Sequence, residues 1–282
     1  MDIQDRIVVI TGAGSGIGEA LAKAFAQSGA RHVVATDMNE GEAERVATEI
    51  EDHGGSASSA HLDVADESQL RALVDRVEDT IGPVDVFVSN AGYVTVAGLE
   101  DSNASIERMW EVHVMAHIYA ARAVVPSMAA RGEGYLLNTA SAAGVLSQIG
   151  SLAYTITKHA AGSLAEWLAI THHHQGIRVS VLCPQAVRTN IVSNSPDEAL
   201  SSGSLDDFGV AAADGIVEAG DVARMCIDAM AEERFHVLPH PEVADYIKMK
   251  ATDADRWLAA MRKFQHRLFG DAPLPGDSLI SR

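Results

Sequence analysis

The sequence predicts an α/β fold in which a doubly wound parallel sheet carries helices on both of its faces. Short apolar runs alternate with amphipathic stretches along most of the 282 residues, and such alternation is typical of right-handed βαβ units. Glycine-rich or polar residues follow several of the apolar runs, at the positions where parallel sheets bind ligands. No linker or break in composition divides the chain, so we expect a single domain over residues 1–270.

The first half of the chain contains four expected strands with helical segments between them. Continuous apolar runs, such as the one over residues 7–10, indicate strands that are buried on both faces. Asp66 and the acidic residue after it are typical of a helix N-terminus. We expect strands over 7–10, 32–36 and 84–88 and one ending at 61–64, with helices over 19–25 and 40–53 and from 66 to Gly82.

The second half continues this alternation and then changes after residue 189. Residues 190–215 are mostly polar and acidic, and so long a loop beside the strand ends favours a substrate lid over a solvated insertion. Residues 271–282 are rich in proline and glycine and should fray. We expect strands over 134–139, 178–182 and 235–238, helices over 105–130 (bent near Pro126), 152–171 and 221–233, and a C-terminal helical extension over 242–269.

Composition excludes several classes of partner. The formal net charge of −18 repels nucleic acid and anionic membrane surfaces. No apolar run approaches the roughly 20 residues that span a bilayer, and the polar N-terminus leaves no room for a signal peptide. Cys183 and Cys226 lie in apolar patterns without metal-ligand spacing, which indicates buried thiols in the cytoplasm. The three consecutive histidines at 172–174 point in different directions on a helix, so we expect no metal site.

The segment TGAGSGIG, residues 11–18, lies between the first strand and the first helix. A glycine-rich turn at this position exposes backbone N–H groups at a helix N-terminus, where a phosphate can bind. Side chains at Gly12, Gly16 and Gly18 would obstruct the tight turn or the close approach of a pyrophosphate. The sequence therefore predicts a dinucleotide site.

Three further residues predict proton-transfer chemistry. Tyr154 and Lys158 are four positions apart on an expected helix, so they share a face. A tyrosine with a pKa near 10 needs a nearby cation to act as an acid or base at neutral pH. Lys158 can supply that cation, and Ser141, at the end of an expected strand, can hold a substrate oxygen against Tyr154.

These motifs together resemble the short-chain dehydrogenase/reductase family, over residues 5 to about 240. The resemblance rests on TGAGSGIG at 11–18, SNAG at 89–92, Ser141, and YTITK at 154–158. It implies a Rossmann-type fold and a nicotinamide cofactor, with Tyr154 as the acid/base and Ser141 positioning the substrate oxygen. Lys158 would lower the pKa of the tyrosine and bind the nicotinamide ribose.

The cofactor is expected to be NAD. Asp37 ends the second strand, where a carboxylate accepts hydrogen bonds from both ribose hydroxyls and repels a 2′-phosphate. Ser15 and Met38 are uncharged where NADP-binding members often carry arginine or lysine. The expected cofactor contacts are Gly12, Ser15, Gly16, Ile17, Gly18, Asp37, Met38, Asp63, Val64, Asn90, Ala91, Gly92, Tyr154, Lys158, Pro184, Val187 and Thr189.

Two residues depart from the family pattern. Gln185 replaces a glycine, which is expected to reshape the turn after the strand over 178–182. His113 replaces the catalytic asparagine that holds a water beside the lysine. One hypothesis is that neutral His113 relays protons between Lys158 and solvent, and that its protonation slows alcohol oxidation at acid pH. The alternative is a packing histidine, and nearby His117 is expected to be a packing or helix-surface residue.

The leading interpretation is an NAD-dependent oxidoreductase that interconverts a secondary alcohol and a ketone. The alternatives are a 3-oxoacyl-thioester reductase and a dinucleotide-binding regulatory protein without turnover, which His113 makes conceivable. The family resemblance implies a homotetramer formed through the helices over 105–130 and 152–171. The loops expected to face a mainly apolar, uncharged substrate carry Tyr93, Val94, Val96, Val145, Leu146 and Ile149.

Overall fold

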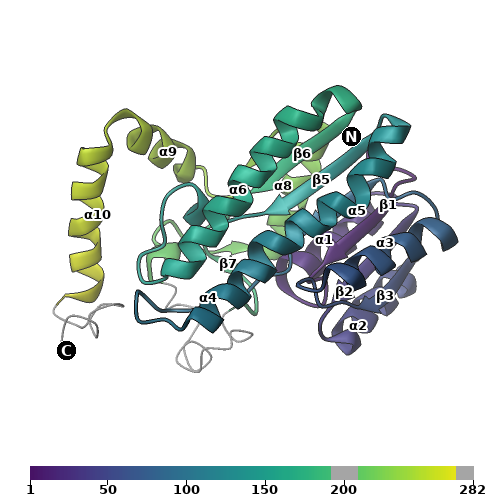
Figure 1. The fold of residues 1–282 in the computed structure, drawn as a ribbon, viewed down its shortest axis with the longest axis horizontal. Helices are drawn as coiled ribbons and strands as arrows, with labels where there is room; N and C mark the ends of the chain where they lie inside the picture. Colours follow the sequence, from purple (N-terminus) through teal and green to yellow (C-terminus); the bar gives the residue numbers. More distant parts are fainter. Residues whose placement is uncertain (192–208, 271–282) are drawn as a thin grey trace.

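The computed structural model describes residues 1–191 and 209–270, and its centre is a seven-stranded parallel sheet (Figure 1). The strand order is β3-β2-β1-β4-β5-β6-β9, and every pairing in this sheet is parallel. The predicted fold class is therefore confirmed. The strands are β1 (Ile7–Thr11), β2 (His32–Asp37), β3 (Ala57–His61), β4 (Val86–Ser89), β5 (Gly134–Thr139), β6 (Ile177–Leu182) and β9 (His236–Val237), while β7 (Val187–Arg188) and β8 (Val217–Glu218) pair separately.

The sheet is covered on both faces, and its central strand β1 is apolar at each of residues 7–10. Along β1, Ile7 and Val9 belong to one apolar core, whereas Val8 and Ile10 belong to another. Successive side chains of a strand point to opposite faces, so each core lies on one side of the sheet. This double burial explains why the strand appears in the sequence as a continuous apolar run.

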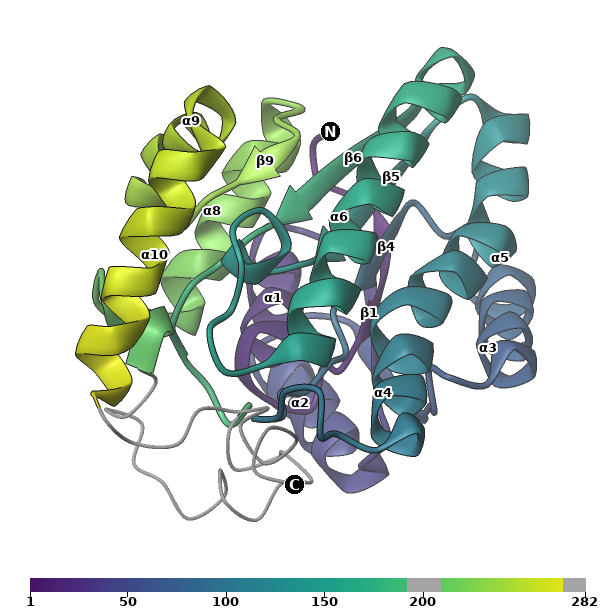
Figure 2. The same cartoon turned by 60° about the vertical axis from the view of Figure 1, so that its left-hand side comes forward.

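Two sets of helices complete the two cores. Residues of α1 (Gly16–Gln27), α2 (Glu40–Asp52) and α8 (Ala219–Ala231) contribute to the core that contains Val8. The core that contains Val9 is completed by residues of α3 (Glu67–Thr80), α5 (Ala116–Arg131) and α6 (Leu152–His172). Figure 2 shows α8 on one side of the molecule and α3 and α5 on the other.

The expected helix over 105–130 is interrupted earlier than Pro126. It consists of α4 (Asn103–Trp110), a π-helical turn over Glu111–Met115, and α5, which contains Pro126. A π-turn accommodates one extra residue in a helix and often marks a functional position. Here it places the buried side chain of His113 between α4 and α5.

The C-terminal extension forms two helices, α9 (Glu242–Thr252) and α10 (Ala254–Phe269). Asp253 separates them because its backbone is extended, and its side chain caps α10 by accepting a hydrogen bond from the Arg256 N–H. Figure 1 shows both helices at the end of the molecule away from β3 and α2.

Most of the expected lid lies outside the described residues, as does the expected frayed tail over 271–282. The part of the 190–215 segment that is described includes a short 3₁₀ turn over Gly209–Ala212. Among residues 1–191 and 209–270, no helix has the length and apolar character needed to cross a membrane.

Candidate active site

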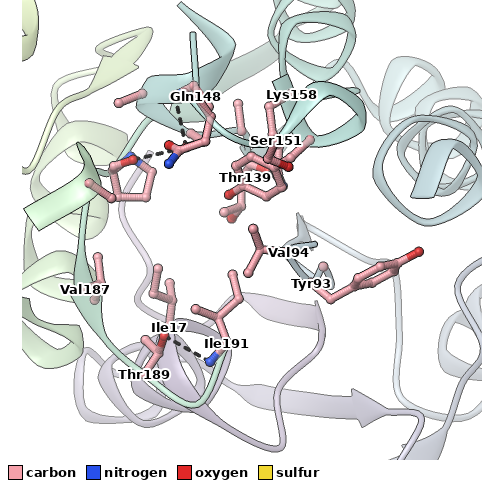
Figure 3. A pocket seen from close by; sticks show the side chains of 18 of the residues that line it. Ile17, Tyr93, Val94, Thr139, Gln148, Ser151, Lys158, Val187, Thr189 and Ile191 are labelled. Carbon is pink, nitrogen blue, oxygen red and sulfur yellow. Dashed lines mark hydrogen bonds between the residues drawn. The ribbon is translucent and has the colours of Figure 1, made fainter. Parts of the chain in front are cut away.

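The sequence-predicted catalytic and cofactor residues meet at the carboxyl ends of the parallel strands. Ser141, Tyr154 and Lys158 line a cavity of about 960 Å³, and residues of the glycine-rich turn line the same cavity. In Figure 3, Lys158 and Ser151 lie on one side of this cavity, and Ile17 and Thr189 lie across from them. The cavity also takes in Gly12, Ser15, Gly16, Asp37, Met38, Val64, Asn90, Ala91, Gly92, Pro184 and Val187.

Tyr154 and Lys158 lie in the first two turns of α6, and Ser141 follows β5. All three side chains are buried. The ammonium of Lys158 donates a hydrogen bond of 3.0 Å to the carbonyl of Thr139, and its Nζ is 5.6 Å from the centre of the Tyr154 ring. The strand that ends at Thr139 therefore fixes the cation beside the tyrosine.

Burial is the largest influence on the pKa values of Tyr154 and Lys158. It raises the pKa of Tyr154, although a hydrogen bond with Ser141 opposes that rise. Burial also lowers the pKa of Lys158 to about 8. Lys158 is not among the groups that shift the pKa of Tyr154 here, and its ammonium donates to Thr139, so the expected lowering of the tyrosine pKa stays a prediction for the cofactor-bound enzyme.

The glycine-rich turn is built for close approach. Gly12 and Gly16 have φ angles of +64° and +56°, which favour glycine. A Cβ on Gly12 would lie 2.8 Å from the Cα of Ala91, and one on Gly16 would lie 2.9 Å from the Cβ of Thr189. Gly18 does not line the cavity; a Cβ there would overlap the carbonyl of Gly12, so Gly18 shapes the turn instead.

Asp37 places a carboxylate at the cavity wall where β2 ends. Its Oδ2 accepts a hydrogen bond from the N–H of Gly14 at 3.0 Å, and its Oδ1 accepts one from the N–H of Asn39 at 2.9 Å. These bonds fix the carboxylate between the glycine-rich turn and α2. The turn and the carboxylate together fit a dinucleotide. The backbone N–H groups of the turn can bind the pyrophosphate, and the carboxylate can accept hydrogen bonds from ribose hydroxyl groups.

Asn90 ties the glycine-rich turn to the neighbouring strands. Its Nδ2 donates to the carbonyls of Thr11 and Gly12, and its Oδ1 accepts from the hydroxyl of Thr139. Thr139 is also the residue that binds Lys158. Asn90 thereby connects the dinucleotide side of the cavity to the catalytic side.

Asp63 is held differently from the other expected cofactor residues. Both of its carboxylate oxygens accept hydrogen bonds of 3.0 Å from Nη2 of Arg108 on α4. Arg108 and Val64 line the cavity, whereas Asp63 does not. Arg108 is a site residue that the sequence motifs do not indicate, because its partner lies 45 positions away in the chain.

Gln185 is anchored on two sides in the turn after β6. Its backbone N–H donates to Nδ1 of His240 at 3.3 Å, and its Nε2 donates to Asp214 at 2.9 Å. The replacement of glycine therefore adds one side-chain hydrogen bond, to Asp214, that helps to hold the turn carrying Val187 and Thr189, which both line the cavity.

His113 connects the loop after β4 to α6. Its Nε2 accepts a hydrogen bond of 3.1 Å from the N–H of Tyr93, so its Nδ1 carries the proton and donates to the hydroxyl of Thr157 at 3.0 Å. That hydroxyl donates to the carbonyl of Tyr154 at 3.2 Å. Thr157 is a second contributor to the site that its place in the segment YTITK does not reveal.

The contacts of His113 give no support to the acid titration expected for it, which stays a hypothesis. Burial, and then the positive charge of Lys158, hold the pKa of His113 well below its ordinary value. Both ring nitrogens are engaged by Tyr93 and Thr157, so neither is free to relay a proton to Lys158. Through these two hydrogen bonds, His113 forms a clamp between the loop after β4 and α6.

The other histidines have no evident catalytic role. His117 is buried rather than at the helix surface, its ring nitrogens have no hydrogen-bond partner in the structure, and burial lowers its pKa to about 3. The histidines at 172–174 lie where α6 ends. Over the described ranges, no group of three or more His, Cys, Asp or Glu side chains can hold a metal ion.

Comparison with known proteins identifies the family. The model of the short chain dehydrogenase family matches residues 6–200. The chain is a short-chain dehydrogenase/reductase. This short-chain dehydrogenase is 33% identical to 1-deoxy-11-beta-hydroxypentalenate dehydrogenase of Streptomyces exfoliatus, over 91% of this chain and 90% of the relative. It is 32% identical to 7alpha-hydroxysteroid dehydrogenase of Escherichia coli K12, over 68% of this chain and 75% of the relative.

Solved structures agree with the fold and the cofactor class. A short chain dehydrogenase/reductase from Burkholderia phymatum in complex with NAD has a TM-score of 0.82 and 30% identity, covering 91% of this chain and 96% of that one. A gluconate 5-dehydrogenase from Burkholderia cenocepacia in complex with NADP and tartrate has a TM-score of 0.75 and 26% identity, covering 86% and 96%. The short-chain dehydrogenase described here is thus an oxidoreductase that uses a nicotinamide dinucleotide.

Proposed function

We propose that this enzyme interconverts a secondary alcohol and a ketone with NAD, using Tyr154 as the acid/base. The observation that carries the proposal is the convergence of the buried side chains of Ser141, Tyr154 and Lys158 in one cavity whose wall includes Asp37 and the glycine-rich turn. The two relatives named above are dehydrogenases of hydroxy compounds, which agrees with this reaction class.

Each residue of the trio has a distinct task in alcohol oxidation. Bound NAD supplies the acceptor for the hydride that leaves the carbinol carbon. Ser141 holds the substrate oxygen by a hydrogen bond, and Tyr154 takes the proton from that oxygen as the carbonyl forms. Lys158 has two N–H donors beyond the one given to Thr139; it binds the nicotinamide ribose and stabilises the phenolate.

The preference for NAD rests on the surroundings of Asp37. A 2′-phosphate at this position would meet a carboxylate, and neither Ser15 nor Met38 offers a positive charge. Arg45 binds the carbonyl of Gly14 at 3.0 Å, but its guanidinium is already paired with Glu19, Glu42 and Glu49. The site therefore favours a free ribose hydroxyl over a phosphate.

The substrate side of the cavity favours an apolar, uncharged alcohol. Val94, Val96, Leu146 and Ile149 line it, and Figure 3 shows Val94 projecting into the space while the ring of Tyr93 is turned away. The residues after β5 that approach the substrate carry no charge over 142–150.

We further propose a homotetramer in the cytoplasm. Trp167 and Ile170 on α6 are 56% and 73% exposed, and Ile156 on the same helix is also exposed. Large apolar side chains gathered on one helix are typical of an interaction site. The cytoplasmic assignment follows from two free, buried cysteines, Cys183 and Cys226.

A screen of secondary alcohols with NAD, in which formation of the reduced cofactor is monitored, tests the proposed activity. We expect oxidation of apolar alcohols and no oxidation of carboxylate-bearing ones. Faster reduction of 3-oxoacyl thioesters than of any simple ketone would favour the thioester reductase instead. Binding of NAD without turnover of any alcohol or ketone would favour the regulatory protein.

A further inference from the structure

We propose that the end of α10 forms a wall of the substrate pocket, where Leu268 and Phe269 select for bulky, fused-ring secondary alcohols. The inference rests on the proposed function and names the substrate class of the same site. Both residues line the cavity that contains Ser141 and Tyr154, although they lie beyond the region that matches the family model.

Helix α9 is fastened to the loop after β5. The ammonium of Lys250 donates hydrogen bonds of 2.9 and 2.8 Å to the carbonyls of Val145 and Leu146. Around this anchor, Val243 is fully buried in an apolar cluster with Ala142 and Leu146. The C-terminal helices are therefore fixed to the loop that begins at the catalytic serine.

A second anchor joins α9 to the turn after β6. The hydroxyl of Tyr246 donates to Oδ1 of Asp214 at 3.0 Å, and Oδ2 of Asp214 accepts from Nε2 of Gln185 at 2.9 Å. His240, just before α9, accepts from the backbone N–H of Gln185 and contacts the carbonyl of Gly215. These contacts assign a role to Gln185, which holds α9 against the turn after β6.

The apolar face of α10 remains partly exposed rather than buried in the core. Trp257 packs beside Tyr246, with ring centres 6.1 Å apart, and so continues the anchored cluster into α10. No residue of α10 is fully buried, and Leu268 is 39% exposed while lining the cavity. An apolar surface at a cavity wall remains available to a ligand.

The chemistry of the wall defines the substrate class. Leu268 and Phe269 add to the apolar residues Val94, Leu146 and Ile149 of the same cavity. A small alcohol held at Ser141 offers less apolar area to these surfaces than a larger one, and a rigid fused-ring alcohol loses no internal rotations on binding. The added apolar surface therefore favours the binding of bulky substrates over charged ones.

The test compares two phenylalanines of α10. Phe269 lines the cavity, whereas Phe264 does not and instead packs against Arg267, so Phe264→Ala is the matched control for Phe269→Ala. Each variant is assayed with 2-decalol, a fused-ring alcohol, and with 2-butanol. Phe269→Ala should lower kcat/KM for 2-decalol by about tenfold, mainly through KM, because the lost contact is an apolar one. Oxidation of 2-butanol should fall less than oxidation of 2-decalol, and Phe264→Ala should leave the oxidation of both alcohols unchanged.

Calorimetric binding of 2-decalone and 2-butanone to the same proteins separates this inference from the proposed function. Weaker binding of 2-decalone to Phe269→Ala than to Phe264→Ala supports the wall, even where wild type turns over neither alcohol and the proposed function fails. Equal losses in the two variants, or a wild type that binds 2-decalone no more tightly than 2-butanone, overturn the inference.

Discussion

Replacing Lys158 with methionine should stabilise the protein while abolishing its activity. The ammonium of Lys158 is buried, and burial lowers its pKa from 10.5 to about 8. A lowered pKa means that the folded state holds the proton less tightly than the unfolded chain does. The destabilisation is thus fully present below pH 8 and is relieved as the pH rises from 8 to 10.5.

The magnitude follows from these two pKa values. Each pKa unit corresponds to about 1.4 kcal/mol, so the buried charge costs roughly 3 kcal/mol at pH 7 and about 1.4 kcal/mol at pH 9.5. Methionine has a similar length and no charge, but it loses the hydrogen bond to Thr139, worth about 1 kcal/mol. We therefore expect Lys158→Met to be more stable than wild type by roughly 2 kcal/mol at pH 7, with little difference remaining at pH 9.5.

Urea unfolding of both proteins at pH 7 and pH 9.5 measures this change directly. The difference in unfolding free energy between variant and wild type should shrink by about 2 kcal/mol between the two pH values. Effects of side-chain packing cancel in that comparison because they do not depend on pH. A stability difference that is the same at both pH values would refute the reasoning, since Lys158 would then titrate as it does in the unfolded chain.

Three further variants test the cofactor site, the clamp and the assembly. Wild type should prefer NAD to NADP by at least about tenfold in kcat/KM, which needs only about 1.4 kcal/mol, and Asp37→Asn should narrow that ratio; comparable values for wild type would refute the assignment. His113→Ala should lower the unfolding free energy by roughly 2–5 kcal/mol, because it leaves the Tyr93 N–H and the Thr157 hydroxyl without their partner. The acid limb of kcat against pH should be the same in wild type and His113→Ala, and a limb shifted in the variant would support the titration of His113. Trp167→Glu should reduce the assembly size measured by light scattering, whereas a monomeric wild type at micromolar concentration would contradict the tetramer.

The strand pattern could be predicted because burial leaves a direct mark on the sequence. Residues 7–10 are apolar throughout, and β6 carries its one charge at Arg178, the one position of that strand that is not fully buried, because a strand covered on both faces leaves little room for charge. The glycines at 12 and 16 were also predictable, because their positive φ angles restrict the residue type.

Other features depend on contacts between distant parts of the chain. The π-turn around His113 adds one residue in a stretch where apolar Val112 and Val114 lie on either side, so periodicity could not locate it. The state of His113 is set by Tyr93 and Thr157, which are 20 and 44 positions away. Phe269 could be predicted to lie on an amphipathic helix, but only the tertiary structure brings it to the cavity of Ser141.

The central claim, that Tyr154 transfers the proton in an NAD-dependent alcohol oxidation, is tested most directly by Tyr154→Phe. The substitution removes one hydroxyl and preserves the buried ring, so calorimetry should give a nearly unchanged Kd for NAD. Oxidation of an accepted alcohol should fall by about a hundredfold or more, in line with the contribution of general acid–base catalysis. A variant that binds NAD normally and keeps more than a few per cent of the wild-type rate would contradict the account, because another group would then be moving the proton.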